Sequence, residues 1–246
     1  MEFLFNLLYN GYQELKFRLY YKPFFERYLT KNHAYFVKLP PSLKNDFLRL
    51  VRDHYEYFEF IPRHELNITK EMMTIISGVA SQLVLNLPLE SLTFFEKIIL
   101  YPDYYKSRIT NKLHKGEVNP GLRLIVFSLR GIMEGINRED DGLNLLLHEF
   151  AHALWLENKI MHQEYTVLNP ALVVYYEQAA TEEVIKMQND DKHFFRKYAL
   201  TNKEEFFAVA VENFFERPEG FKNAAPELYQ CLVALFRQDL LTSRYR

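Results

Sequence analysis

The chain has 246 residues and a mass of 29.5 kDa; 48% of the residues are hydrophobic and 25% charged, as is ordinary for a globular protein. Lys and Arg number 30 against 32 Asp and Glu, and this balance excludes a broadly basic nucleic-acid binder. Only 8 glycines are present, which disfavours a glycine-rich phosphate loop. The single cysteine, Cys231, excludes an internal disulfide and a cysteine-based zinc cluster.

The N-terminal segment does not predict export or membrane insertion. Its first apolar run, residues 3–9, is far shorter than the roughly 20 residues of a spanning helix. Glu2, and not a basic residue, follows Met1, and no small-residue cleavage site comes after it. We therefore expect a cytoplasmic protein with no transmembrane segment.

Two regions are predicted from the N-terminal composition. Residues 1–42 are expected to form a helical extension, and residues 43–246 one compact domain. The aromatic and basic side chains of 12–28 favour an arm that packs on the body. Contact of these side chains with a membrane surface is the alternative.

Hydrophobic periodicity predicts an α+β fold that is rich in helix. Two apolar runs, 98–101 and 122–129, indicate short buried strands. Thr69 is suited to cap the second of the helices predicted after residue 42. Apolar side chains recur at helical spacing over 43–58, 69–87, 143–157, 171–187, 203–215 and 227–239. The sequence thus places a small sheet ahead of a long central helix.

His148, Glu149 and His152 form an H-E-x-x-H motif inside this central helix. Residues four apart lie on one helical face, so both imidazoles can reach one metal ion. Glu149 can then act as a general base beside a water on that ion. The flanks LNLLL and ALWL indicate a buried helix, where such polar side chains are costly without a metal or partners. The motif predicts catalytic zinc, which uses three protein ligands and leaves one position to water.

The third ligand is not determined by the motif. Trp155 and Asn158 stand where the extended motif requires Gly and His, and His162 lies beyond the predicted helix. A carboxylate from a later helix is therefore the usual alternative. Spacing alone leaves six glutamates open: Glu177, Glu182, Glu183, Glu204, Glu205 and Glu212. Glu205 and Glu212 are favoured because they lie among Phe and Val side chains, where a carboxylate needs a reason to be buried.

Several stretches resemble the MtfA-type zinc metallopeptidases, whose catalytic segment is similar to that of the anthrax lethal factor. The resemblance extends from about residue 43 to residue 239. It implies a zincin-like fold with one zinc ion per chain, held by His148, His152 and Glu205. The matching segments are REDDGLNLLLHEFAHALW, NKEEFFAVAVENFFERP, LFRQD, ITKEMMTIISGVASQLVLNL and IILYPDYY.

The resemblance also implies a role for Tyr198, seven residues before Glu205. Its phenol would stabilise the oxyanion of the tetrahedral intermediate. One departure is visible, because family members often continue the motif as HEFAHKLD. Here Ala153, Leu154 and Trp155 follow, and loss of the Asp could change the support of the ligands or the substrate preference.

We therefore expect a zinc-dependent peptidase acting on a peptide or protein substrate. Glu149 would take a proton from the attacking water and pass it to the leaving amine. The strand at 122–129 is the expected sheet edge that pairs with the substrate backbone. One alternative is a regulatory binding protein that sequesters a transcriptional repressor, with weak or secondary proteolysis. Another is zinc-dependent hydrolysis of a non-peptide amide.

Overall fold

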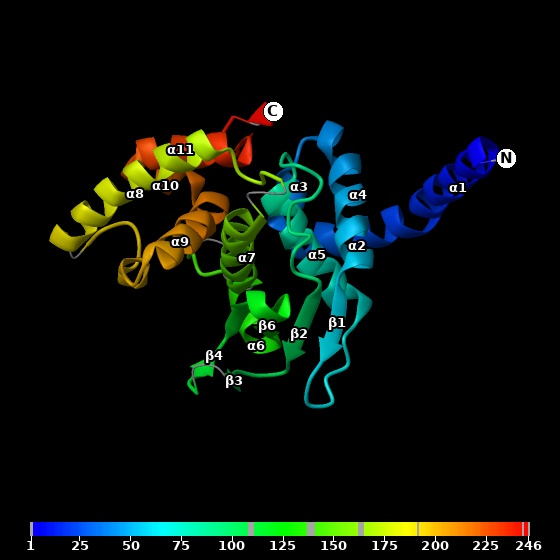
Figure 1. Ribbon diagram of the computed structural model, residues 1–246, viewed down its shortest axis with the longest axis horizontal. Coiled ribbons are helices and arrows are strands. Elements are labelled where there is room, and N and C mark those ends of the chain that lie inside the picture. The colour runs from blue at the N-terminus through cyan, green and yellow to red at the C-terminus, as the bar shows by residue number, and fades with distance from the viewer. Residues whose placement is uncertain are drawn as a thin grey trace.

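The computed structural model describes residues 2–107, 111–136, 141–161, 165–190, 192–242 and 244–245. His162, one of the weaker ligand candidates, lies outside these residues. Within them, no helix combines the length and apolar character needed to cross a membrane. The architecture is the predicted α+β arrangement, rich in helix, with a small sheet whose strands precede the H-E-x-x-H helix (Figure 1).

The central sheet has four strands in the order β1-β2-β6-β5. Strands β1 (Glu59–Pro62), β2 (Lys97–Tyr101) and β6 (Leu124–Ser128) run parallel, and β5 (Gly116–Asn119) is antiparallel to β6. The expectation that 122–129 forms the edge is wrong, because β6 is hydrogen-bonded to β2 on one side and to β5 on the other. Among the described strands of this sheet, β5 and β1 are the edges.

Helices α5 (Lys70–Val84) and α7 (Leu145–Met161) pack on one face of this sheet, where the main hydrophobic core lies. Phe150 of α7 contacts Phe127 of β6, with their ring centroids 5.5 Å apart. Helix α9 (Lys203–Glu216) packs along α7 on the side away from the sheet, so α7 is enclosed over most of its surface (Figure 1). This enclosure explains why α7 carries apolar side chains on nearly all sides.

Further C-terminal helices cover α9. These are α8 (Pro170–Asn189), α10 (Pro218–Ala224) and α11 (Pro226–Phe236). The last predicted helix was too long, because Arg237 adopts a left-handed φ of 53° and ends α11. The remaining elements after residue 57 are α6 (Leu129–Ile136), β3 (Tyr105–Lys106), β4 (Leu113–His114), β7 (Gln238–Asp239), β8 (Arg244–Tyr245) and the 3-10 turns η2 (Pro120–Leu122) and η3 (Lys197–Leu200).

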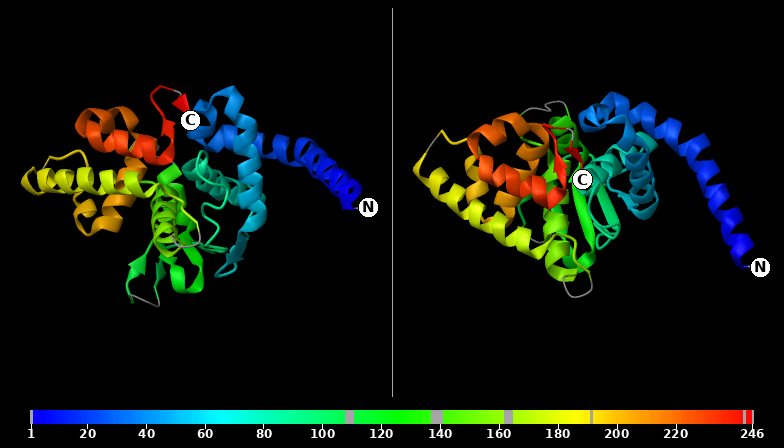
Figure 2. Two further views of the ribbon diagram at one scale, coloured as in Figure 1. Left: turned by 45° about the horizontal axis from the view of Figure 1, so that its top comes forward. Right: turned by 90° about the horizontal axis from the view of Figure 1, so that it is seen from above.

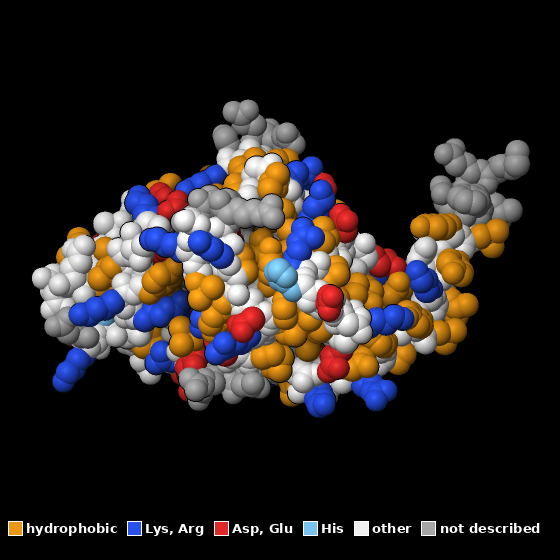
Figure 3. Space-filling view, turned by 90° about the horizontal axis from the view of Figure 1, so that it is seen from below, with side chains coloured by type: hydrophobic (Ala, Val, Ile, Leu, Met, Phe, Trp, Pro, Cys, Tyr) orange, Lys and Arg blue, Asp and Glu red, His pale blue; other side chains and the backbone are white. Residues whose placement is uncertain are grey.

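The N-terminal region is helical, as expected, and only part of it packs on the body. Helix α1 (Glu2–Lys16) projects away from the rest of the molecule (Figures 1 and 2). Figure 3 shows hydrophobic side chains along this projecting segment, and Leu8, Tyr12 and Leu15 are exposed there. Glu14 pairs with Arg49 at 2.8 Å and Lys16 pairs with Glu56 at 3.2 Å, so the expected packing is found at the last turn of α1 and fails for its projecting part.

Burial of side chains against the body begins at Phe17. The π-helical turn η1 (Phe17–Tyr21), α2 (Lys22–Asn32) and α3 (Ala34–Lys38) bury a second cluster of side chains against α4 (Pro41–Tyr57). Its fully or almost fully buried members are Phe17, Phe25, Leu29, Phe36, Leu39, Phe47, Leu48 and Val51. The cluster draws on residues from both sides of position 42, and the division there stays a prediction.

Candidate metal centre

Helices α7 and α9 bring two imidazoles and one carboxylate together. His148 Nε2 lies 3.1 Å from His152 Nε2 and 3.0 Å from Oε2 of Glu205, and His152 Nε2 lies 3.4 Å from the same oxygen. Among the described residues, these three form the group of His, Cys, Asp or Glu side chains whose ligand atoms all lie within 4.8 Å of one another. The i, i+4 spacing on α7 and the packing of α9 against it produce this convergence.

The geometry fits a metal ion. Ligands placed about 2.0–2.1 Å from a tetrahedral zinc ion are separated by about 3.3 Å, which is close to the distances found here. Oε2 of Glu205 is buried, yet no hydrogen-bond donor is aligned on it. A buried carboxylate oxygen in that state is expensive, and a cation between the three side chains would satisfy it. The donor set of two imidazoles and a carboxylate suits zinc.

Glu149 lies beside this group, and strand β5 makes room for it. The Glu149 side chain is buried on α7, with 6% of its surface exposed. A Cβ added to Gly116, the first residue of β5, would lie 2.6 Å from Oε1 of Glu149. Glycine at this position therefore allows the carboxyl group to occupy its site. Gly116 is not evident from the sequence, because a short strand that begins with glycine and is polar in part has no clear hydrophobic pattern.

Glu212 holds His148 from the other side. Its Oε1 accepts a hydrogen bond from His148 Nδ1 at 2.7 Å, which leaves Nε2 facing Glu205 and His152. Arg196 donates to the same oxygen at 2.6 Å and to the backbone carbonyl of Gly142 at 2.6 Å. The backbone N–H of Asn144 donates to Oε2 of Glu212 at 2.8 Å. Glu212 is therefore engaged in orienting a candidate ligand, and Arg196 is a contributor that the sequence did not reveal.

Charge and burial set the protonation of the group. Burial lowers the pKa of His148, but the Glu205 and Glu212 carboxylates beside it outweigh that effect and raise it to about 10. Burial raises the pKa of Glu205, but the two imidazoles beside it hold that pKa well below its usual range. His148 and Glu205 therefore share a proton, and a metal ion that binds here would have to displace it. Burial also raises the pKa of Glu149, which favours acceptance of a proton near neutral pH.

Tyr198 stands at the edge of the group on η3, directly before α9. Its ring centroid lies 6.1 Å from that of His148, and half of its surface is exposed. Burial and the Glu205 carboxylate raise the pKa of its phenol to about 12, so the hydroxyl keeps its proton at neutral pH. Tyr198, His148 and Glu149 line one open cavity of about 1040 Å³. The phenol can therefore donate a hydrogen bond to a molecule held in this cavity.

The other glutamates that spacing left open, Glu177, Glu182, Glu183 and Glu204, do not belong to this group of ligand atoms. Glu183 accepts a hydrogen bond from His193 at 2.8 Å and pairs with Lys186 at 2.9 Å. Glu204 pairs with Lys159 at 2.8 Å on the surface. Both carboxylates thus have partners elsewhere.

Trp155 marks the departure from the family motif. Its side chain is 3% exposed, and its ring packs against Phe207 with centroids 4.6 Å apart. Tyr176 approaches the same ring edge-on, with centroids 5.8 Å apart. An apolar contact between α7, α8 and α9 therefore occupies the position where many family members have a carboxylate.

The chain is similar to known proteins over most of its length. The family model described as glucose-regulated metallo-peptidase M90 matches residues 17–237. The Mlc titration factor A of Pectobacterium atrosepticum is 27% identical over 216 residues, covering 81% of this chain and 78% of that protein. The Mlc titration factor A of Edwardsiella ictaluri is 28% identical over 213 residues, covering 81% of this chain and 82% of that protein. An uncharacterized protein of Synechocystis sp. is 24% identical over 229 residues, covering 85% and 82%.

Proposed function

The chain belongs to the glucose-regulated metallo-peptidase M90 family, and from this premise we propose that it is a zinc-dependent peptidase. His148, His152 and Glu205 would hold the zinc ion. When bound, zinc supplies the Lewis acidity that lowers the pKa of a water molecule and polarises a carbonyl group. The observation that carries the proposal is the convergence of the three ligand atoms within 4.8 Å. Glu149 is buried beside them, and each chain would hold one ion.

Glu149 is proposed to carry out the proton transfers of the reaction. Its carboxylate would take a proton from the attacking water and pass it to the nitrogen of the departing amine. Tyr198 would donate a hydrogen bond to the oxyanion that develops on the scissile carbonyl, since its phenol stays protonated at neutral pH. Glu212 and Arg196 would act by keeping the His148 ring in position.

Strand β5 is the proposed binding edge for the substrate backbone. One side of β5 is hydrogen-bonded to β6, and the other side has no described strand paired with it. Its first residue, Gly116, adjoins Glu149, so a peptide added along β5 would run toward the metal centre. This proposal replaces 122–129 as the substrate edge.

The test combines metal analysis with a peptide-library digest. Protein purified without chelators should contain about one zinc per chain, as three protein ligands and an open position require. Glu149→Gln should keep this zinc and lower the rate by about 10²- to 10⁴-fold, the usual effect of losing a general base. Glu204→Gln, on the exposed side of α9, is the matched control with normal activity. Less than about 0.2 zinc per chain after addition of zinc would contradict the metal assignment.

A second candidate function is the binding of a regulatory protein. Two relatives are named Mlc titration factor A, a name that denotes titration of a partner. This chain could likewise sequester a transcriptional repressor, with proteolysis weak or secondary. The Glu149→Gln variant separates the two functions, because binding without hydrolysis would survive the substitution. A partner that the active chain cleaves and the variant only binds would instead be a substrate.

A further inference from the structure

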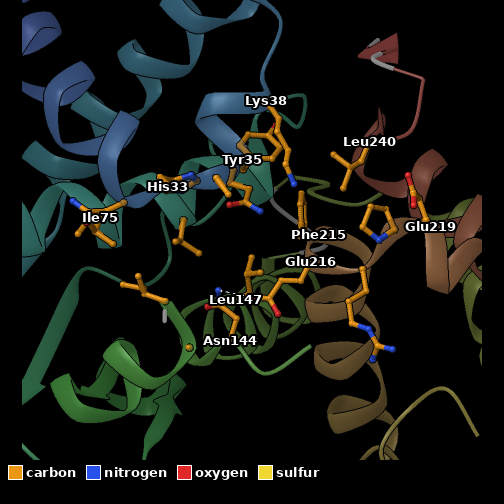
Figure 4. Close-up of a pocket in the computed structure, with 18 of the residues that line it drawn as sticks. His33, Tyr35, Lys38, Ile75, Asn144, Leu147, Phe215, Glu216, Glu219 and Leu240 are labelled. Carbon is orange, nitrogen blue, oxygen red and sulfur yellow. Dashed lines mark hydrogen bonds between the residues drawn. The ribbon is translucent and has the colours of Figure 1, made fainter. Parts of the chain in front are cut away.

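A second cavity, of about 560 Å³, lies among α2, α3, α5, α7 and the junction of α9 with α10 (Figure 4). This volume is within the range of about 300–1000 Å³ that is typical of small-molecule sites. The cavity is distinct from the metal centre, although Gly135 and Asn144 line both. No local sequence pattern points to this cavity, because its walls come from segments far apart in the chain.

Two groups that can carry opposite charges project into this cavity, and an ammonium group beside Glu216 would favour the ionised form of its carboxyl. Figure 4 shows Lys38 reaching in from α3 and the Glu216 side chain entering from α9. Lys38 makes no ion pair within 4.0 Å with any carboxylate of the described residues. Glu216 accepts one hydrogen bond, from the Asn144 side chain at 2.9 Å, while its Oε2 is buried and has no described partner. Lys38 therefore offers the cavity a cation with no ion-pair partner among the described residues, and Glu216 offers an unsatisfied carboxyl oxygen.

Apolar side chains also line this cavity. Val79 of α5, Leu147 of α7 and Phe215 of α9 belong to or pack against the main core and face the cavity. We propose that the cavity binds a short apolar peptide with free termini, whose ammonium group meets Glu216 and whose carboxylate meets Lys38. The side chains of the peptide would then lie against the apolar wall. Such molecules are the products that a peptidase releases.

The cavity is connected to the metal centre through Asn144. The side chain of Asn144 donates to Glu216, and its backbone N–H donates to Glu212 at 2.8 Å. Glu212 in turn holds His148 through a 2.7 Å hydrogen bond. An ammonium group at Glu216 would alter the first of these contacts, so occupancy should change the affinity of the metal centre. This coupling rests on the proposed function, whereas binding in the cavity does not.

Calorimetry with leucyl-leucine on metal-free full-length protein tests the binding directly. Removal of the metal prevents the peptide carboxylate from binding at the metal centre. The expected result is one bound peptide per chain. Acetylation of its amino group or amidation of its carboxylate should each weaken binding at least about tenfold, since each removes one charge-assisted contact.

Substitutions locate the site. Glu216→Gln should weaken leucyl-leucine at least about tenfold and make the protein indifferent to acetylation of the peptide. Lys38→Met should likewise weaken leucyl-leucine binding and make the protein indifferent to amidation of the peptide. Lys31→Met, on the outer face of α2, should bind leucyl-leucine as the unaltered chain does. No binding at millimolar peptide, or equal binding by all of these variants, would overturn the proposal. Native circular dichroism spectra of the variants would show that any loss is local.

The coupling has its own measurement. Zinc affinity is titrated with and without saturating leucyl-leucine, in the unaltered chain and in Lys38→Met. We expect a change of at least about threefold in the unaltered chain and none in the variant, within the usual range of coupling between sites. Binding without a change in zinc affinity would retain the peptide site and reject the connection through Asn144.

Discussion

Helix α9 supplies a carboxyl group to each of two neighbouring cavities, and the two groups are held very differently. Glu212, beside the metal centre, accepts hydrogen bonds from His148, Arg196 and the Asn144 backbone. Glu216, one helical turn later, accepts one from the Asn144 side chain, and burial with the nearby Glu212 charge raises its pKa to about 8. The charged form of a buried carboxyl group is therefore stabilised by nearby cations. A position on the same helix does not by itself bring such cations close.

The largest expected effect separates the ligand from the residue that orients it. Glu205→Ala should lower zinc affinity by more than the roughly 10- to 100-fold that is typical when a residue behind a ligand is removed. Glu212→Ala should fall within that range, because it leaves all three ligand atoms in place. Titration with a competing chelator measures both. The assignment would be reversed by a Glu212→Ala protein that lost zinc beside a Glu205→Ala protein that kept it.

The next effect concerns the space around Glu149. Gly116→Ala places a methyl group 2.6 Å from the present position of Oε1 of Glu149, so the carboxyl must move. A displacement of about 1 Å can cost about 10²-fold in rate, and we expect a loss of that order with zinc retained. Peptide hydrolysis and zinc content are the measurements. Gly121→Ala is the control, because its added Cβ meets nothing closer than 3.5 Å.

A smaller effect is expected at Arg196. Arg196→Met removes the cation next to Glu212 but leaves the Glu212–His148 hydrogen bond. Zinc affinity should fall about tenfold, at the lower end of effects from residues that support a ligand. The same chelator titration applies, with Arg130→Met as a surface control. Unchanged affinity in Arg196→Met would show that His148 and Asn144 suffice to hold Glu212.

The smallest effect tests Glu216 through pH. Its pKa in the folded protein is about 8, above its ordinary value of 4.5, so the stability present below pH 4.5 is lost progressively as the pH rises toward 8. Glu216→Gln cannot ionise, and its Tm should fall less than that of the unaltered chain between pH 5 and pH 9. Glu219→Gln, at an exposed neighbouring position, should behave as the unaltered chain does. If Tm fell equally with pH in all three proteins, the interpretation that Glu216 is buried in its protonated form would be rejected.

Local patterns in the sequence determined the main helices and the motif. The i, i+4 spacing of His148 and His152 acts within one helix, so it needs no tertiary information. Thr69 caps α5 as expected, with its hydroxyl accepting from the backbone of Met72 at 3.2 Å. Long apolar runs predicted α7 and α9, because each helix buries nearly its whole surface in one core.

The tertiary structure decided what lies across elements. Glu205 and Glu212 are two turns apart on one helical face, and only the packing of α9 on α7 places one near Nε2 and the other at Nδ1 of His148. The edge of the sheet was misassigned because strand order depends on pairings between distant segments, and β5 separates β6 from solvent. Lys38 and Glu216 line one cavity because α3 and α9, which are far apart in the sequence, lie close together in the fold. Hydrophobic pattern specifies which side chains are buried, whereas side-chain partners follow from how the elements dock.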